Sequence, residues 1–291
     1  MRVVFVRERK HSRQPFHVDY PVLDDPQEIP SVDYLVCEST YGGRLHTKDK
    51  SVEQTMVETI EKVCIKEQGR LIIPAFSIGR TQSLVYSLNK IFSSKLLPPV
   101  KVFVDSPLAS RSTEVFRKYH SLVNKEAQEF YQKRGDEFEF DNLTYVETLK
   151  DSRQVSNYFE PCIIISSAGM LDGGRIQDHL FYNIQNYYCT ILFIGYCAKG
   201  TLGHRLLRGD PIVHIKDRDL SVYATIKQTD VLSAHGDHDD LMNTVKQMDE
   251  AKLKNVFLVH GENTSLQAFA DALEEEGYVV TIPEKGVSYN I

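Results

Sequence analysis

The chain has 291 residues, with 34 lysines and arginines against 40 aspartates and glutamates, and its formal net charge at pH 7 is −6. A composition of 42% hydrophobic and 25% charged residues, with 16 glycines and 11 prolines, is typical of a globular protein and excludes a collagen-like fibre or a low-complexity array. The apolar runs are far shorter than the roughly 18 residues of a membrane-spanning helix, and no signal segment opens the chain, so we expect a cytoplasmic protein with no membrane partner.

Short apolar runs that end in polar or glycine residues recur along the chain after an irregular opening stretch, and a helical pattern follows them. Six of these runs are Tyr34–Cys37, Leu71–Phe76, Val102–Val104, Ile163–Ile165, Ile191–Ile194 and Val256–Val259. Alternation of strand and helix is typical of parallel α/β sheets, in which ligands bind beyond the carboxyl ends of the strands. We therefore expect an α/β protein of about two domains, with its functional residues at strand ends.

Apolar spacing predicts the helices between these strands. Ser51 and Gln54 form a capping box, and the apolar residues behind them lie on one helical face. The segment 111–151 is charged and helical, and we interpret it as a peripheral elaboration. Two further helices are predicted near the C terminus, with inward faces made by Leu241, Val245 and Met248 and by Leu266, Phe269, Ala270 and Leu273.

Several motifs that would indicate other chemistry are absent. The chain has no GxxxxGK[ST] and no GxGxxG, so we expect no nucleotide cofactor, and it has no GxSxG nucleophile elbow. Its five cysteines form no CxxC pair and mostly lie in apolar runs, which predicts buried free thiols in a reducing compartment.

Ten histidines make a metal site possible. His46, His120 and His214 have no partner at ligand spacing, and His179 and His204 lie on helical stretches, so we expect all five at the surface. Three others stand near strand ends, and a catalytic zinc needs three protein ligands and an open position. The residues that could converge on such a site are Glu38, His235, Asp237, His238 and His260. On spacing alone, the alternative is a set of histidines held by hydrogen bonds at helix termini.

Six blocks of the chain, in order, resemble the signatures of one family. They are Leu35–Gly42 (LVCESTYG), Ile73–Gln82 (IPAFSIGRTQ), Val104–Ala109 (VDSPLA), Ala168–Arg175 (AGMLDGGR), Ser233–Asp237 (SAHGD) and Leu258–Glu262 (LVHGE). Singly each block is weak, but in this order they are similar to the β-CASP branch of the metallo-β-lactamase fold over about residues 31–291. That branch includes RNA-processing nucleases, such as the endonuclease subunit of messenger 3′-end cleavage and its bacterial and archaeal relatives.

The resemblance implies roles for five residues. His260 matches a ligand of one of two zinc ions, His235 the histidine that protonates the leaving 3′ oxygen, and Glu38 the carboxylate that orients and charges it. An adjacent carboxylate favours the protonated imidazole, and two zinc ions lower the pKa of a bridging water. Arg80 and Arg175, each at a strand-to-helix turn, are expected to contact substrate phosphate.

One part of the family pattern is missing. The main zinc motif, HxHxDH, should precede Glu38, and the 291 residues do not contain it. The similar run His235–His238 is no substitute, because its neighbours match a later signature and Ser233 occupies the place of the first histidine. One matched ligand, His260, does not hold zinc. We therefore expect a chain truncated by a misplaced start or a frameshift, inactive in isolation, with C-terminal strands that lack sheet partners.

The predicted fold class is α/β. We expect residues 1–38 to be a remnant of the metallo-β-lactamase domain, 39–228 to be a β-CASP domain with a parallel sheet, and 229–291 to be the C-terminal portion of a metallo-β-lactamase αββα sandwich. The expected function is that of a zinc-dependent ribonuclease-family protein, catalytically incomplete, with RNA and a second copy of the chain as partners. The alternatives are a non-catalytic scaffold or RNA-binding partner that has lost its metal site, and a small-molecule binder.

Overall fold

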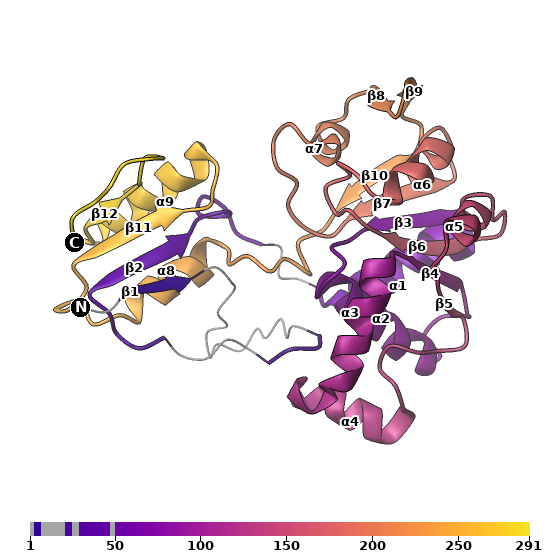
Figure 1. The fold of residues 1–291 in the computed structure, drawn as a ribbon, viewed down its shortest axis with the longest axis horizontal. Helices are drawn as coiled ribbons and strands as arrows, with labels where there is room; N and C mark the ends of the chain where they lie inside the picture. Colours follow the sequence, from indigo (N-terminus) through magenta and orange to yellow (C-terminus); the bar gives the residue numbers. More distant parts are fainter. Residues whose placement is uncertain (1–2, 7–20, 25–28, 47–49) are drawn as a thin grey trace. The chain divides into compact units, whose positions relative to one another are not determined.

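The computed structural model of the chain describes residues 3–6, 21–24, 29–46 and 50–291 (Figure 1). Its contacts divide the chain into two compact units. Unit 1 consists of Met1–Asp19, Asp25–Lys48 and Ser233–Ile291, and unit 2 of Tyr20–Asp24 and Asp49–Leu232. The domain boundaries expected from the sequence, at 38/39 and 228/229, were drawn from the family signatures and differ from the boundaries of these two units. Much of the predicted remnant 1–38 lies outside the described residues.

Unit 2 is built on a six-stranded sheet in which all neighbouring strands are parallel. In sheet order the strands are β10 (Thr225–Gln228), β7 (Cys189–Phe193), β3 (Arg70–Pro74), β6 (Cys162–Ser166), β4 (Lys101–Asp105) and β5 (Leu143–Tyr145). The predicted parallel α/β architecture is confirmed. All five residues of β6 are buried, as is typical of a central parallel strand that is covered on both faces.

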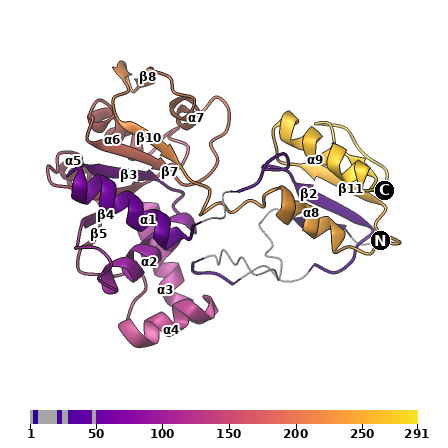
Figure 2. The same ribbon diagram turned by 180° about the vertical axis from the view of Figure 1, so that it is seen from behind.

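Helices cover both faces of this sheet (Figures 1 and 2). Successive residues of β6 contribute to opposite cores, Ile163 and Ile165 to one and Ile164 to the other. The first core is completed by α1 (Val52–Ile60), η1 (Glu61–Lys66), α2 (Arg80–Ser93), α3 (Pro107–Lys118) and α4 (Lys125–Arg134), with the short η2 (His120–Leu122) before α4. The second is completed by α5 (Leu149–Ser156), α6 (Ile176–Asn183), α7 (Leu202–Leu207) and the antiparallel hairpin of β8 (Ile212–Ile215) and β9 (Arg218–Ser221).

The predicted start of α1 is confirmed in detail. Ser51 Oγ accepts the Gln54 N–H at 3.1 Å, and the Gln54 side chain accepts the Ser51 N–H at 3.0 Å. This reciprocal pair satisfies two donors of the first turn, so the helix begins where the sequence places it. Behind the cap, Val52, Met56 and Ile60 are buried in the first core, as their spacing predicts.

Unit 1 contains a four-stranded sheet, parallel throughout. Its strands, in order, are β1 (Val3–Val6), β2 (Tyr34–Glu38), β11 (Asn255–Val259) and β12 (Val280–Thr281). The helices α8 (His238–Lys246) and α9 (Asn263–Glu275) pack on one face, against alternate residues of the two central strands. Both helical faces predicted near the C terminus are buried there.

The prediction that the C-terminal strands lack sheet partners is wrong for β11. The register pairs Val256 with Leu35 of β2 on one side and with Val280 of β12 on the other. The chain segment before Glu38 supplies the neighbour, so the C-terminal strand is central and not an edge. Because β2 and β11 lie side by side and run in the same direction, their carboxyl ends meet at one edge of the sheet.

No helix in the described part of the chain is long and apolar enough to cross a membrane. All five cysteines are buried and unbridged, as predicted. Burial raises the pKa of the thiols of Cys64, Cys162, Cys189 and Cys197 to about 12, and a thiol that stays protonated is a poor nucleophile.

Candidate active site

Glu38 is the last residue of β2, and its carboxylate is almost completely buried, with 1% of the residue exposed. Two backbone donors hold it: the Thr40 N–H lies 2.9 Å from Oε2 and the Gly236 N–H lies 3.1 Å from Oε1. A buried carboxylate is costly unless such partners offset the loss of water. The side chain is therefore fixed by the loops that follow β2 and precede α8.

His235 lies in the loop before α8. The helix α8 is capped at its N terminus by Asp237, which forms a capping box with Asp240. Asp237 accepts the Asp240 N–H at 2.9 Å, and the Asp240 carboxylate accepts the Asp237 N–H at 3.2 Å. The imidazole of His235 is 22% exposed, and its Nδ1 lies 3.3 Å from Oε2 of Glu38. Beneath the loop, Nε2 of His46 lies 3.0 Å from the carbonyl oxygen of His235.

His260 follows β11 directly and takes a left-handed backbone conformation, with φ of 54°. A side chain other than glycine rarely adopts this conformation without a local reason. Here the strand-end loops approach closely: the Ser39 N–H lies 3.4 Å from the His260 carbonyl oxygen, and a Cβ on Gly261 would lie 2.7 Å from the Ser39 carbonyl oxygen. The tight turn directs the His260 imidazole toward the end of β2.

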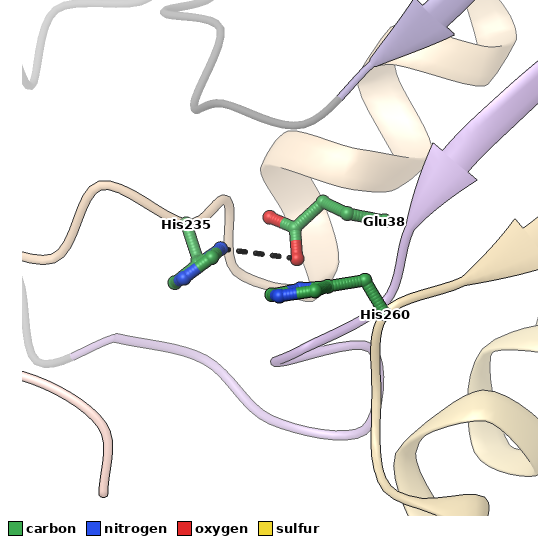
Figure 3. Close-up of side chains that lie close together, drawn as sticks. All are labelled: Glu38, His235 and His260. Carbon is green, nitrogen blue, oxygen red and sulfur yellow. Dashed lines mark ion pairs between the residues drawn. The ribbon is translucent and has the colours of Figure 1, made fainter. Parts of the chain in front are cut away.

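Three predicted residues come together at this edge of the unit 1 sheet (Figure 3). One nitrogen or oxygen atom from each of Glu38, His235 and His260 lies within 4.8 Å of the others. The two imidazoles stack, with ring centroids 5.2 Å apart and planes inclined by 28°. Glu38 is buried, His235 is half-buried and His260 is exposed, so the two imidazoles are open to a bound molecule while the carboxylate is not.

The electrostatics of the cluster favour an ionised Glu38. Burial opposes ionisation, but the hydrogen bonds from His235 and Thr40 and the charge of His235 outweigh it and lower the pKa of the Glu38 carboxyl. An ionised carboxylate only accepts hydrogen bonds, so it holds a proton on Nδ1 of His235 and leaves Nε2 directed elsewhere. This is the arrangement of a histidine oriented to transfer a proton.

The donor set suits zinc in kind, because imidazole and carboxylate are ordinary zinc ligands. The number of available ligands is too small for a catalytic zinc. Both oxygens of Glu38 already accept hydrogen bonds, so only the imidazoles of His235 and His260 remain as ligands. A catalytic zinc uses three protein ligands and an open position. The described residues therefore fit part of a zinc site and do not complete one.

The remaining members of the HxDH run have structural partners. The Asp237 carboxylate caps α8 and accepts the His46 N–H at 3.1 Å, and Nδ1 of His238 lies 2.7 Å from the Gly42 carbonyl oxygen. Neither belongs to the cluster that could hold a metal. Of the five residues that the sequence suggested for a metal site, three, Glu38, His235 and His260, therefore lie together.

The two arginines expected at phosphate lie in unit 2 and have protein partners. Arg80 is 8% exposed, and its Nη1 donates to the Ile194 carbonyl oxygen at 2.5 Å. Arg175 donates from Nη1 to Oδ1 of Asp105 at 2.6 Å and from Nη2 to the Glu147 carbonyl oxygen at 2.6 Å. Their role in binding phosphate stays a prediction.

Two histidines expected at the surface are buried, and that expectation is wrong. His46 is 6% exposed beneath the His235 loop, and His179 is completely buried, with Nε2 2.7 Å from Oδ2 of Asp105. A signal for His179 was present in the sequence, because Ile176, His179 and Leu180 share one helical face. No sequence spacing indicates that His46 reaches the His235 loop, 189 positions away.

Two family models match the chain. A Beta-Casp domain covers residues 81–206, within unit 2, and a domain described as "Zn-dependent metallo-hydrolase RNA specificity domain" covers residues 219–283, which contain His235 and His260. Four of the six blocks, Val104–Ala109, Ala168–Arg175, Ser233–Asp237 and Leu258–Glu262, lie within these two matched ranges.

Curated proteins are similar to almost the whole chain. Ribonuclease TTHA0252 from Thermus thermophilus is 28% identical over 265 residues, which is 91% of this chain and 60% of the relative. An RNase J-like protein from Methanocaldococcus jannaschii is 29% identical over 87% of this chain and 58% of its own length, and Endoribonuclease YSH1 from Eremothecium gossypii is 27% identical over 84% and 32%. The chain spans about three fifths of the first two relatives. These two domains, the fold and the relatives together place the chain in the β-CASP branch of the metallo-β-lactamase fold.

Proposed function

We propose that this chain carries the proton-transfer part, and one zinc ligand, of a site that hydrolyses RNA phosphodiester bonds. The observation that supports it best is the convergence of Glu38, His235 and His260 at the carboxyl ends of β2 and β11. Relatives named as ribonucleases agree with RNA as the substrate. The reaction is attack of water on phosphorus with departure of the 3′ oxygen.

In this proposal His235 donates the proton that the leaving 3′ oxygen takes up, and Oε2 of Glu38 lies 3.3 Å from its Nδ1. Glu38 also fixes the ring through Nδ1, so that Nε2 faces the substrate. His260 binds metal. Two zinc ions in a complete family site would supply an activated water and stabilise charge on the phosphate.

We propose further that the 291 residues are catalytically incomplete on their own. They contain no HxHxDH motif, and with His235 as the proton donor the cluster in the described residues leaves His260 for metal. The remaining zinc ligands would then have to come from outside the described residues. The isolated chain should bind far less than two zinc ions and should not cleave RNA.

The test is reconstitution. The 291-residue chain is mixed with a separate polypeptide that carries an HxHxDH segment and that cleaves no RNA by itself. Zinc content and cleavage of a labelled single-stranded RNA are measured with and without EDTA. We expect EDTA-sensitive cleavage only in the mixture, and its loss with His235→Gln. The matched control is His214→Gln, which removes an exposed histidine of unit 2.

Robust EDTA-sensitive cleavage by the purified chain alone would contradict the proposed incompleteness. Cleavage by the mixture that survives His235→Gln would contradict the assigned proton donor.

The absence of HxHxDH favours one alternative, a non-catalytic scaffold or RNA-binding partner. It predicts that the chain binds RNA and that no added segment restores cleavage. The retention of Glu38, His235 and His260 together argues against it, because a protein that only binds RNA has no chemical need for the trio. A homodimer and a cytoplasmic location remain parts of the proposal, to be tested by sedimentation and by localisation of the tagged chain.

A further inference from the structure

Thr40 lies at the centre of the Glu38, His235 and His260 cluster and has no role in the reaction as proposed. It is 7% exposed and follows β2 by two residues. Its hydroxyl oxygen lies 3.1 Å from Nδ1 of His260, 3.1 Å from the His260 carbonyl oxygen and 3.4 Å from Nδ1 of His235. Its backbone N–H donates to Glu38 at 2.9 Å. One residue thus contacts all three members.

The hydroxyl has one proton for four neighbours, because it also hydrogen-bonds the Glu38 carboxylate and helps to lower the pKa of that carboxyl. The His260 carbonyl oxygen only accepts, and its other donor, the Ser39 N–H, is 3.4 Å away. The Glu38 carboxylate likewise only accepts, so whichever of these two acceptors takes the hydroxyl proton, the hydroxyl oxygen must accept from Nδ1 of His260. An imidazole that donates from Nδ1 carries its lone pair on Nε2 when neutral.

We propose that the Thr40 hydroxyl fixes the tautomer of His260, holding its proton on Nδ1 and leaving Nε2 as the nitrogen that can bind a metal ion. Thr40 is then a positioning residue of the site assigned under the proposed function, on which this inference rests. Partners of this kind orient metal-binding histidines in general, and their removal typically lowers metal affinity about 10- to 100-fold.

The same hydrogen bond explains how the strained turn at His260 persists. The left-handed backbone orients the His260 carbonyl oxygen toward the loop after β2, where the Thr40 hydroxyl and the Ser39 N–H reach it. A residue in this conformation is maintained by its surroundings. Thr40 therefore bonds both the backbone and the ring of His260, which sets the direction of the ring as well as its tautomer.

The test reads the tautomer directly. The 291-residue chain is labelled with ¹⁵N-histidine, and two-bond ¹H–¹⁵N correlations are recorded at about pH 8, where ordinary imidazoles are neutral. The His260 signals are assigned as those missing from His260→Gln. We expect the Nδ1–H form in the wild type, a shift to the Nε2–H form in Thr40→Val, and the wild-type form in Thr40→Ser, which keeps the hydroxyl.

The matched control is Ser39→Ala. Ser39 is buried next to Thr40, but its Oγ has no hydrogen-bond partner among the described residues, so the His260 signals should not change. A wild-type His260 with its proton on Nε2 overturns the proposal, and this result needs no variant to fold. A folded Thr40→Val with an unchanged tautomer overturns it as well.

A second readout separates this inference from the function on which it rests. In the reconstituted mixture, Thr40→Val should weaken zinc binding about 10- to 100-fold, and Thr40→Ser should restore it. If no mixture cleaves RNA, the proposed function fails while the tautomer result is unaffected. If the mixture cleaves RNA but zinc affinity is equal in Thr40→Val and the wild type, Thr40 does not position a ligand.

Discussion

In each unit, a buried carboxylate at the end of a strand pairs with a histidine. Glu38 ends β2 and pairs with His235, and Asp105 ends β4 and pairs with His179. In both pairs the carboxylate is buried and its pKa is lowered by hydrogen bonds from the histidine and its neighbours, against the effect of burial. The two pairs differ in what the second imidazole nitrogen contacts.

In unit 2 the pair is closed. Nδ1 of His179 lies 3.2 Å from Ser156 Oγ, so both ring nitrogens have partners, and the ring has no exposed surface. The Asp105 carboxylate also accepts from Ser152 Oγ at 2.5 Å and from Arg175 at 2.6 Å. Every polar group is satisfied within the protein, which is the condition for a buried network that stabilises a fold.

In unit 1 the pair is open. His235 bonds Glu38 through Nδ1, its ring is 22% exposed, and its Nε2 has no hydrogen-bond partner among the described residues. A carboxylate–histidine pair at a strand end is therefore not by itself a sign of catalysis. Two features distinguish the imidazole of His235, which can contact a substrate, from that of His179, which stabilises the fold. The ring of His235 is partly exposed, and its second nitrogen makes no hydrogen bond to a described residue.

The sharpest test of this comparison makes one substitution at both histidines. In the reconstituted enzyme we expect His235→Gln to lower the rate of RNA hydrolysis about 10²- to 10⁴-fold, because a general acid is lost, and to change the free energy of unfolding by no more than about 1 kcal/mol. His179→Gln should instead destabilise the fold, because it disturbs a closed network. Initial rates and urea unfolding of both variants measure this, and the comparison fails if the two variants behave alike.

The next largest effect, on the free energy of unfolding, is expected at Asp105, the carboxylate of the closed pair in unit 2. Asp105→Asn leaves Arg175 and His179 without their charged partner and should lower the free energy of unfolding by about 3–5 kcal/mol. The matched control is Asp178→Asn, which removes a half-exposed partner of Lys216 and should cost about 1 kcal/mol or less. Urea unfolding followed by circular dichroism measures both, and equal losses in the two variants would show that Asp105 is no more important than a surface ion pair.

The stabilisation that Asp105 provides should also depend on pH. The fold holds the pKa of Asp105 below its unfolded value of 3.8, so the native state favours the ionised form. That stabilisation is complete above the unfolded pKa and is lost as the pH falls through the folded pKa. The difference in unfolding free energy between wild type and Asp105→Asn should therefore shrink between about pH 6 and about pH 3, by at most about 1 kcal/mol, the limit that the unfolded pKa of 3.8 sets over this range. A difference that is constant over this range would contradict the assigned ionisation.

Much of the fold follows from local pattern. Runs such as Ile163–Ile165 and Val256–Val259 have strand length and end in polar residues, and the Ser51 capping box marks a helix start. Because carboxyl ends of neighbouring parallel strands share an edge, Glu38 and His260 could be expected to meet as soon as their strands were recognised.

The rest depended on packing between distant segments. His46 lies in a loop with no periodicity, and its contact with His235 exists only because the loops after β2 and before α8 fold together. The role of Thr40 was hidden for a related reason: a threonine after a strand is ordinary, and only three-dimensional structure shows its hydroxyl between two imidazoles. The missed burial of His179 was avoidable, since Ile176 and Leu180 mark its helical face.

The smallest effect concerns Arg80 and Arg175, of which Arg175 belongs to the closed network of unit 2. It sharpens the comparison by testing whether these two side chains also bind RNA. If Arg80 and Arg175 contact phosphate, Arg80→Gln and Arg175→Gln should each weaken RNA binding severalfold and lower the slope of log affinity against log salt by about one, because one fewer counterion is released. Fluorescence anisotropy with a labelled single-stranded RNA measures this, at a temperature where circular dichroism shows each variant folded.

The matched control is Arg153→Gln, which removes an exposed arginine of α5 and should leave the salt slope unchanged. Arg175 donates to Asp105 and to two backbone carbonyl oxygens, so its loss should destabilise unit 2 whatever its role in binding. The salt slope separates the two roles, since it reports contacts with phosphate and not stability. An unchanged slope in folded Arg80→Gln and Arg175→Gln would limit both arginines to holding the sheet ends in place, and RNA would then be bound by other residues.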